Sequence, residues 1–485
     1  MARKLKVFRT PIGFHDAYVA APSQKAALQA WGTATDLFAR GVAEQVTDAA
    51  LMEEPLAHPG DVIRKTRGTV DDHLAALPAT HKRKPADATD APPAKPQRTK
   101  PKPRPSRSKL DQAEQAIEEA ARYRGPSLDE LPSQGAAIAF APCTFTRLVD
   151  SPVLSGEHMR TVELTAPGDS VPVRLRMACD SETGLGIKDA QVTALKQLVK
   201  ESRALFGTQH YRHYDFLLTL SDHVAQFGLE HHESSDDRVA ERYWIDDDQR
   251  VSDADLLAHE YVHSWNGKFR RPARLATGDY FTPMQGDLLF VYEGLTQYLG
   301  YLLAERSGLW SETYYRDRLA TIAATLDMSP GRQWRPLSDT AVAAQLLYFA
   351  PGQWASYRRG TDFYDEGWLI WLDVDTTIRR LTDGKKSIED FCHLFHGGES
   401  FGPMLRPYSF DDVVAALNQV VANDWKGFLT SRVYQVTSHA PMDGITNGGW
   451  KLVFTDARNE FGRTGDVDRF DAAFSIGLRV RARDG

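Results

Sequence analysis

Cysteine is scarce in this sequence, and the few cysteines present argue against a disulfide-bonded architecture. Cys143, Cys179 and Cys392 are odd in number and far apart, so they indicate no disulfide framework and favour a reducing compartment. The chain also lacks any Cys-x-x-Cys pair. A metal site in this protein therefore has to be made from histidine and carboxylate side chains.

Long apolar runs are missing as well. No stretch of about 20 apolar residues occurs, which argues against a membrane span. The first residues carry charge, but no apolar run of about 7–15 residues follows them as it does in a signal peptide. These absences predict a cytoplasmic protein. The net charge of -7 is mild and favours no particular partner, and the oligomeric state is not predicted.

The composition changes sharply at one place in the chain. Residues 82–109 contain ten Lys or Arg, two Asp and seven Pro. Such a segment cannot bury apolar surface, so we expect a stiff, extended and solvated linker. A plain spacer is the simpler interpretation, and a basic arm that touches nucleic acid or anionic lipid is the alternative. Apart from this weak exception, no nucleic-acid partner is expected.

Patterns of apolar residues predict an α+β protein. Before the linker we expect a strand near residues 4–10 and a helix over residues 24–46. After it, residues 136–180 alternate like strands, and a further strand is expected over 214–220. Helical patterns dominate residues 253–423.

A His-Glu-x-x-His motif carries the strongest chemical signal. His259 and His263 lie four residues apart, which on a helix places them on one face about 6 Å apart. Two imidazoles in this arrangement can share one Zn²⁺. Glu260 follows the first histidine and can act as the base toward a water on the metal. Ser252 and Asp255 resemble a capping box and support the helix, although the motif alone also occurs by chance.

A catalytic zinc needs a third protein ligand and an open position. The next candidate is Glu293, which lies in the apolar segment 288–300. A carboxylate in such a helix is costly unless it is paired or bound to a metal. The alternative is a glutamate on the solvent-facing side of an amphipathic helix.

Another embedded acid lies upstream of the motif. Glu230 follows an expected strand and lies close to Gly228. An edge strand at a cleft can hold an extended peptide by main-chain hydrogen bonds, while a carboxylate pairs with the substrate ammonium. The alternative is an acid that belongs to a turn.

A tyrosine marks the start of an apolar helix downstream. The phenol of Tyr364 can donate a hydrogen bond to the oxyanion of a tetrahedral intermediate. The alternative is packing in the core, which is the commoner role of a tyrosine in this position.

Four motifs taken together resemble the glycyl aminopeptidase family of zinc metallopeptidases, in the family's order and over about residues 145–485. The family belongs to the gluzincins and has a thermolysin-like catalytic domain. The motifs are Gly228-Leu-Glu-His, His259-Glu-Tyr-Val-His-Ser-Trp-Asn with Arg271-Pro272 after it, Tyr292-Glu-Gly-Leu-Thr-Gln-Tyr and Phe363-Tyr-Asp-Glu-Gly.

The resemblance implies a zinc aminopeptidase site with a preference for N-terminal glycine or alanine. It implies that Tyr364 stabilises the transition state and that Glu260 is the general base. The implied zinc ligands are His259, His263 and Glu293. Glu230 is implied to bind the substrate amine, and the implied substrate-binding strand consists of Gly228, Leu229, Glu230 and His231.

The resemblance also implies how the chain is divided. Family members usually begin with a large β-domain and end with a PDZ-like domain, and here only the end of the first and the start of the second are recognisable. The expected parts are a small α/β unit of unknown function (1–75), a linker with a short helix (76–125), a β-domain remnant (126–180), a thermolysin-like zinc catalytic domain (181–310), a mostly α-helical domain (311–448) and the start of a truncated PDZ-like domain (449–485).

The function expected from these features is removal of small N-terminal residues from peptides by a metal-activated water. The expected partners are therefore peptides with a free N-terminus, and the expected cofactor is Zn²⁺. A zinc endopeptidase is the alternative within the same chemistry. A peptide-binding scaffold that retains an inactive zinc site is the alternative from another class, and the incomplete flanking domains favour it.

Overall fold

The computed structural model describes residues 5–12, 15–31, 37–38, 43–66, 143–279, 281–350, 354–464, 469–472 and 478–481. The chain divides into two compact units, residues 1–103 and 104–485. The linker and the short helix expected over 76–125 lie outside the described residues.

The N-terminal unit is a four-stranded antiparallel sheet with the strand order β3-β1-β2-β4. Because neighbouring residues of a strand point to opposite faces, Val7 and Phe8 belong to two separate core clusters. Helix α1 packs on the cluster around Phe8, and α2 packs on the cluster around Val7. The elements are β1 Lys6–Ile12, β2 His15–Ala21, α1 Gln24–Ala30, β3 Glu44–Gln45, α2 Ala49–Ala57 and β4 Ile63–Thr66.

The helix in this unit is shorter than the apolar pattern predicts. The prediction extended it over residues 24–46, but α1 ends at Ala30, and Glu44–Gln45 form a strand. Gly32 and the threonines that follow it are poor helix formers, which weakens any continuation beyond Trp31. The strand expected near residues 4–10 is present as β1.

The larger unit is built on a five-stranded mixed sheet with the order β5-β6-β7-β9-β8. The inner strands β6, β7 and β9 run parallel, and each outer strand is antiparallel to its neighbour. The strand β8 forms an edge, so one side of its backbone is not used by the sheet. The strands are β5 His158–Glu163, β6 Val173–Cys179, β7 Tyr214–Leu220, β8 Phe227–Glu230 and β9 Ser234–Val239.

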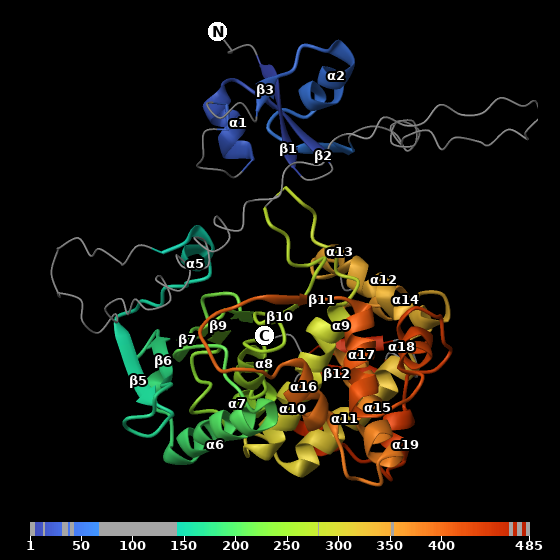
Figure 1. Ribbon diagram of the computed structural model, residues 1–485. Helices are drawn as coiled ribbons and strands as arrows, with labels where there is room; N and C mark the ends of the chain where they lie inside the picture. The colour runs from blue at the N-terminus through green and yellow to red at the C-terminus, as the bar shows by residue number, and fades with distance from the viewer. Residues whose placement is uncertain are drawn as a thin grey trace, which may run out of the picture. The chain divides into compact units, whose positions relative to one another are not determined.

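Helices make up most of the remaining unit and gather beside the sheet (Figure 1). None of the described helices is long and apolar enough to cross a membrane. They are α5 Phe145–Val149, α6 Asp189–Phe206, α7 Asp247–Ser252, α8 Leu256–Val262, α9 Leu289–Tyr292, α10 Gly294–Arg306, α11 Glu312–Asp327, α12 Leu337–Val342, α13 Ala344–Leu347, α14 Ala355–Arg358, α15 Asp365–Leu381, α16 Ile388–Phe395, α17 Phe410–Val420, α18 Trp425–Val433, α19 Asp443–Asn447 and α20 Glu460–Thr464.

Two pairs of short strands complete the unit. β10 (Arg270–Pro272) runs parallel to β11 (Arg406–Tyr408), and β12 (Arg469–Ala472) runs antiparallel to β13 (Leu478–Arg481). The first pair ties the chain just after the histidine motif to a segment more than a hundred residues downstream. Together with the five-stranded sheet and the helices, these elements confirm the α+β class.

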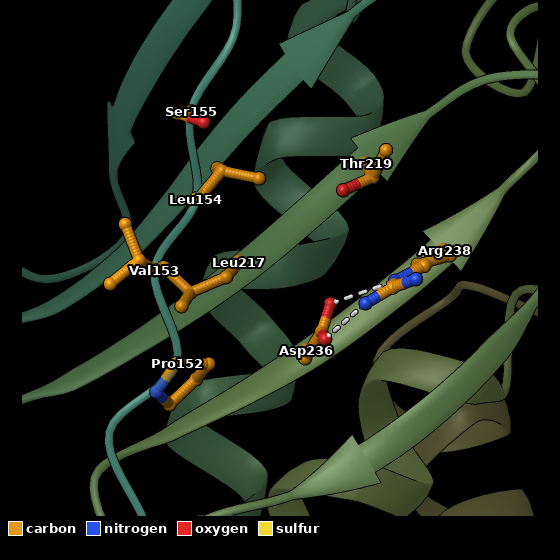
Figure 2. Close-up of a pocket in the computed structure, with 8 residues that line it drawn as sticks. All are labelled: Pro152, Val153, Leu154, Ser155, Leu217, Thr219, Asp236 and Arg238. Carbon is orange, nitrogen blue, oxygen red and sulfur yellow. Dashed lines mark hydrogen bonds and ion pairs between the residues drawn. The ribbon is translucent and has the colours of Figure 1, made fainter. Parts of the chain in front are cut away.

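The two faces of the large sheet differ. Phe216, Leu218 and Leu220 are fully buried in the main core on the face that packs against helices. On the other face the segment 152–155 crosses the strands and leaves a cavity of about 120 Å³ (Figure 2). The cavity is lined by Pro152, Val153, Leu154, Ser155, Leu217, Thr219, Asp236 and Arg238. None of the predicted site residues lines it.

The large sheet continues across the domain boundary that was expected at residue 180. Strands β5 and β6, which we assigned to a β-domain remnant, pair with each other and with β7 because main-chain hydrogen bonds join them into one sheet. One continuous core also spans the parts expected at 181–310 and 311–448. The PDZ-like assignment of residues 449–485 stays a prediction.

Candidate metal centre

The helix α8 carries the histidine motif through the middle of the larger unit. It packs against β8 and β9 on one side and against α10 on the other. The two helices approach closely at Gly300, where a Cβ atom would lie only 3.0 Å from the Cα of His259. Any larger residue at this point would have to push the backbone of α8 away, so the glycine favours the close approach of α10.

Three side chains converge between these helices. The Nε2 atoms of His259 and His263 are 3.1 Å apart. The Oε2 atom of Glu293 lies 3.4 Å from the first nitrogen and 3.3 Å from the second. Ligand atoms in a tetrahedral zinc site lie about 2 Å from the ion and hence about 3.3 Å from one another. The predicted ligand set therefore has the spacing that zinc requires.

The hydrogen bonds around the three ligands also suit a metal ion. Nδ1 of His263 lies 2.9 Å from the carbonyl oxygen of Asn266, so this nitrogen donates its proton and Nε2 is left as the ligand atom. The amide of Asn266 is itself held by the carbonyl oxygen of Val291 at 2.8 Å. Among the described residues, the buried Oε2 of Glu293 has no hydrogen-bond partner. A buried acceptor without a partner is costly, and a bound cation removes that cost.

Charge coupling within the centre is strong. Burial opposes the charge on Glu293, but His263 and His259 outweigh it and lower the pKa of Glu293 to about 2. Burial likewise opposes the charge on His263, but Glu293 and Glu230 outweigh it and raise the pKa of His263 to about 10. The pair is therefore charged at neutral pH when no metal neutralises it.

Glu260 lies against the edge strand β8. A Cβ atom at Gly228 would be 2.1 Å from Oε1 of Glu260, so only a glycine leaves room for this carboxylate. Its Oε2 is buried and has no partner among the described residues. Burial raises the pKa of Glu260 well above its usual range; His263 opposes this, and Glu230, Asp237 and Glu293 add to it. Burial therefore favours the protonated form of Glu260, and a cation nearby would favour the carboxylate that a general base requires.

Glu230 reaches the same centre from the end of β8. Its carboxylate, the Glu260 carboxylate and a ring nitrogen of His263 lie within 4.8 Å of one another. The phenol of Tyr292 donates a hydrogen bond to Oε1 of Glu230. The structure therefore places Glu230 beside Glu260 and His263, together with a tyrosine that the prediction did not include.

Tyr364 lies directly before α15 and faces the first histidine. Its ring centroid is 6.0 Å from that of His259, and its hydroxyl is hydrogen-bonded to the hydroxyl of Tyr348. Burial, followed by Glu293, raises the pKa of Tyr364 well above its usual range. The phenol therefore remains a proton donor at neutral pH, as a group that contacts an oxyanion must.

Two glycines hold the Glu293 and Tyr364 segments together. A Cβ at Gly294 would be 2.8 Å from the Cα of Gly367, and a Cβ at Gly367 would be 2.5 Å from the Cα of Gly294. The helices α10 and α15 therefore touch backbone to backbone beside the centre. The glycines of the two motifs thus serve to bring the third ligand and the tyrosine into one place.

A buried ion-pair network fixes the start of α15. Glu366 is 1 % exposed and accepts hydrogen bonds from Arg332, at 2.7 Å, and from Arg359. Arg359 also binds Asp362 at 2.7 Å. This network anchors the turn that carries Tyr364.

Not every predicted substrate-binding residue reaches the centre. His231 is turned toward Asp150, with 3.3 Å between its Nδ1 and the carboxylate, which also binds Lys268 at 2.7 Å. Leu229 is 46 % exposed on the outer side of β8, because neighbouring residues of a strand point in opposite directions. Gly228 and Glu230 share the inward-facing side.

Sequence reasoning missed Tyr292 and Tyr348. Tyr292 directly precedes Glu293 in an apolar segment, residues 288–292, where an aromatic residue is usually part of the hydrophobic core. Its position next to a candidate ligand was the one feature of the sequence that could have indicated a role in the site. Tyr348 follows the short helix α13 and carries no motif, so nothing in the sequence separates it from the other tyrosines.

The centre thus brings together two histidines and three acidic side chains that could hold a metal ion, and a family model matches the part of the chain that contains most of them. Residues 252–370 match the family of M61 glycyl aminopeptidases. This match confirms, for that segment, the resemblance inferred from the motifs, and it supports a peptidase, a hydrolase of peptide bonds. It includes both histidines, Glu260, Glu293 and Tyr364, whereas Glu230 lies outside it. No curated protein sequence matches the chain.

Solved structures of aminopeptidases and metallopeptidases are weakly similar. An aminopeptidase N family protein from Idiomarina loihiensis is 20 % identical, with 59 % of this chain and 49 % of that chain covered and a TM-score of 0.49. An M1 zinc metallopeptidase from Deinococcus radiodurans, bound to a Tyr-Ser-Ala substrate, is 17 % identical, with 58 % and 52 % covered and a TM-score of 0.37. The chain spans about half the length of these structures.

Proposed function

We propose that this protein is a zinc-dependent aminopeptidase that removes small residues, glycine or alanine, from peptide N-termini. The observation that carries the proposal is the convergence of three ligand atoms, at 3.1–3.4 Å from one another, beside a buried carboxyl group. His259, His263 and Glu293 would hold the ion. Their nitrogen and carboxylate donors are those of catalytic zinc sites, which leave one position open.

The proposed mechanism assigns one task to each of the remaining groups. Zinc, when bound, supplies Lewis acidity, which activates a water and polarises the scissile carbonyl. Glu260 takes a proton from the attacking water and passes it to the leaving amine. Tyr364 donates a hydrogen bond to the oxygen that develops negative charge. Glu230 pairs with the substrate ammonium and so fixes the peptide by its first residue.

Glu230 is what favours an aminopeptidase over an endopeptidase. An endopeptidase cleaves within a chain and has no ammonium group to bind. A carboxylate that shares the centre with Glu260 and His263 within 4.8 Å would also repel the backbone oxygens of an internal segment. A free N-terminus supplies the charge that compensates it.

Cleavage of matched substrates tests the proposal. The purified zinc-loaded chain should hydrolyse glycine and alanine arylamides and should leave the N-acetylated forms intact. Absence of turnover with one zinc bound per chain would favour the peptide-binding scaffold. Equal cleavage of free and acetylated substrates would favour the endopeptidase.

Several finer assignments are part of the same proposal. They are the thermolysin-like layout of the catalytic region, the preference for glycine and alanine, and the PDZ-like character of residues 449–485. The cytoplasmic location rests on the composition and stays a prediction.

A further inference from the structure

Tyr292 occupies the space between the zinc-ligand helix and the proposed amine site. It is the last residue of α9 and directly precedes the ligand Glu293. Its side chain is almost fully buried, at 5 % exposure. Its ring packs on the His263 ring with 5.0 Å between the centroids. Its hydroxyl donates to Oε1 of Glu230.

The position of this phenol is tightly constrained. A Cβ atom at Gly267 would lie 3.1 Å from both Cζ and Oη of Tyr292, so little free space remains between residue 267 and the end of the ring. The His263 ring covers one face. A ring held in this way keeps its hydroxyl in one place, and a hydrogen bond to it fixes whatever accepts it.

Glu230 needs such a fixed donor. Its long side chain has rotamer freedom that costs free energy to restrict. The Glu260 carboxylate lies close to it, and two carboxylates at this distance repel each other. Among the described residues no lysine or arginine forms an ion pair with Glu230. The Tyr292 hydroxyl is therefore the group that holds one oxygen in place and leaves Oε2 for a ligand.

We infer that Tyr292 is the positioning residue of the amine site, because its hydroxyl orients the Glu230 carboxylate toward the ammonium group of the substrate. This inference rests on the proposed function. It goes beyond that function by assigning the orientation of the amine site to a residue that binds neither the metal nor the scissile bond.

The test is the Tyr292→Phe variant, which keeps the ring and removes only the donor. We expect about tenfold weaker binding of alaninamide, measured by calorimetry on the zinc-loaded chain. In hydrolysis of alanine arylamide, KM should rise by about the same factor while kcat changes by less than about twofold, since the bond is lost in ground and transition states alike. The zinc content should stay at one per chain.

A second variant shows whether the effect passes through Glu230. In a Glu230→Ala background, adding Tyr292→Phe should change neither alaninamide binding nor KM. If Tyr292→Phe weakens binding by the same factor in both backgrounds, or if it leaves binding unchanged in the wild-type background, the inference is wrong.

The chain offers a closely matched control. Tyr298 lies on α10, is 2 % exposed and donates a hydrogen bond of 2.7 Å to the carboxylate of Asp375. Tyr298→Phe therefore removes the same kind of buried bond and should leave alaninamide binding and KM unchanged. An equal rise in KM in this variant would mean that the loss reflects general loosening and would overturn the inference.

Failure of the proposed function looks different from failure of this inference. Suppose that the wild-type chain binds alaninamide, that Tyr292→Phe weakens this binding, and that the wild-type chain cleaves no arylamide. The role of Tyr292 in the amine site is then supported, and the proposed aminopeptidase activity is wrong. If the wild-type chain cleaves arylamides and Tyr292→Phe leaves KM unchanged, the proposed aminopeptidase activity is supported and the inferred role of Tyr292 is wrong.

Discussion

Two of the buried charge clusters in the larger unit differ in one respect, because only one of them balances its own charge. In the network at the start of α15, Arg332 and Arg359 face the carboxylates of Glu366 and Asp362. Two positive and two negative groups meet there, so their formal charges cancel within the chain. A network of this kind can be complete as soon as the chain has folded.

The metal centre has the opposite character. Three carboxylates, Glu230, Glu260 and Glu293, gather around two histidines, and no described lysine or arginine forms an ion pair with any of them. Two of the carboxylate oxygens are buried without a hydrogen-bond partner among the described residues. Such an excess of buried negative charge is stable only if a cation or protons compensate it. The difference is that the first cluster is neutralised by the chain's own side chains, whereas the second keeps an excess of acidic groups that a bound cation would neutralise.

The largest expected effect is the loss of turnover when Glu260, the proposed base of the metal centre, is replaced. Glu260→Gln keeps the shape of the side chain but removes the base, so kcat for alanine arylamide should fall on the order of 10³-fold or more. Because Glu260 is not a ligand, the zinc content should remain one per chain. Both quantities are measured on the same preparation, by hydrolysis and by elemental analysis. Turnover close to that of the wild type would exclude Glu260 as the base.

Breaking the balanced network should affect stability and leave the metal in place. Glu366→Ala removes the carboxylate that both buried guanidinium groups share and leaves Arg332 without its ion pair, which we expect to lower the free energy of unfolding by about 3–5 kcal/mol. Urea unfolding of the zinc-loaded chain measures the loss. The control is Asp411→Ala, which breaks an exposed pair with Lys426 and should cost less than about 1 kcal/mol. Loss of zinc in folded Glu366→Ala would contradict the separation of the two clusters.

The third variant, Glu230→Ala, tests whether the carboxylate of Glu230 binds the substrate amine. Glu230→Ala removes a charge-assisted hydrogen bond to the substrate ammonium, worth about 1.5–3 kcal/mol. The value of kcat/KM for free alanine arylamide should therefore fall about 10- to 150-fold, while the N-acetylated form stays unreactive. An unchanged kcat/KM together with a lower unfolding midpoint would mean that Glu230 only stabilises a turn.

The ligand set could be predicted from the sequence because helix geometry determines most of it. A spacing of four residues puts His259 and His263 on one face wherever the helix lies. Glu293 could be predicted as a ligand because a carboxylate in an apolar helix is costly unless it is paired or bound to a metal. These arguments are local, and they require no knowledge of how the elements pack.

The rest of the site depends on packing that no local pattern reveals. Tyr292 and Tyr348 look like core residues in the sequence, and only the tertiary structure places one beside Glu230 and the other beside Tyr364. The same limit applies to the fold. The resemblance places residues 126–180 in a β-domain remnant, whereas β6 pairs with β7 in the sheet of the larger unit. Alternation in the sequence does not encode such long-range pairing.

The last expected effect concerns binding instead of catalysis, and it is a dependence of zinc affinity on pH. In the metal-free chain the Glu293 and Glu230 carboxylates, against the effect of burial, raise the pKa of His263 to about 10, so its ring carries a proton at neutral pH. A metal ligand must be a neutral imidazole, and zinc has to displace that proton. The zinc affinity should therefore rise about tenfold for each pH unit between pH 6 and pH 9. Calorimetry in buffers of different ionisation enthalpy counts the protons released.

The titration of His263 also predicts how the stability of the metal-free chain changes with pH. This change should arise in the metal centre and not in the ion-pair network of α15. The pKa of His263 in the folded, metal-free chain, about 10, lies above the value of about 6.5 for an unfolded chain. Its ion pair with Glu293 therefore stabilises the fold fully below about pH 6.5, and the contribution is lost as the pH rises through 10. The unfolding midpoint of the metal-free chain should fall over this range. Zinc-loaded protein, whose His263 is already neutral, should lack this part of the decline. If both forms lose stability in parallel between pH 7 and pH 10, then the charge that titrates is not in the metal centre.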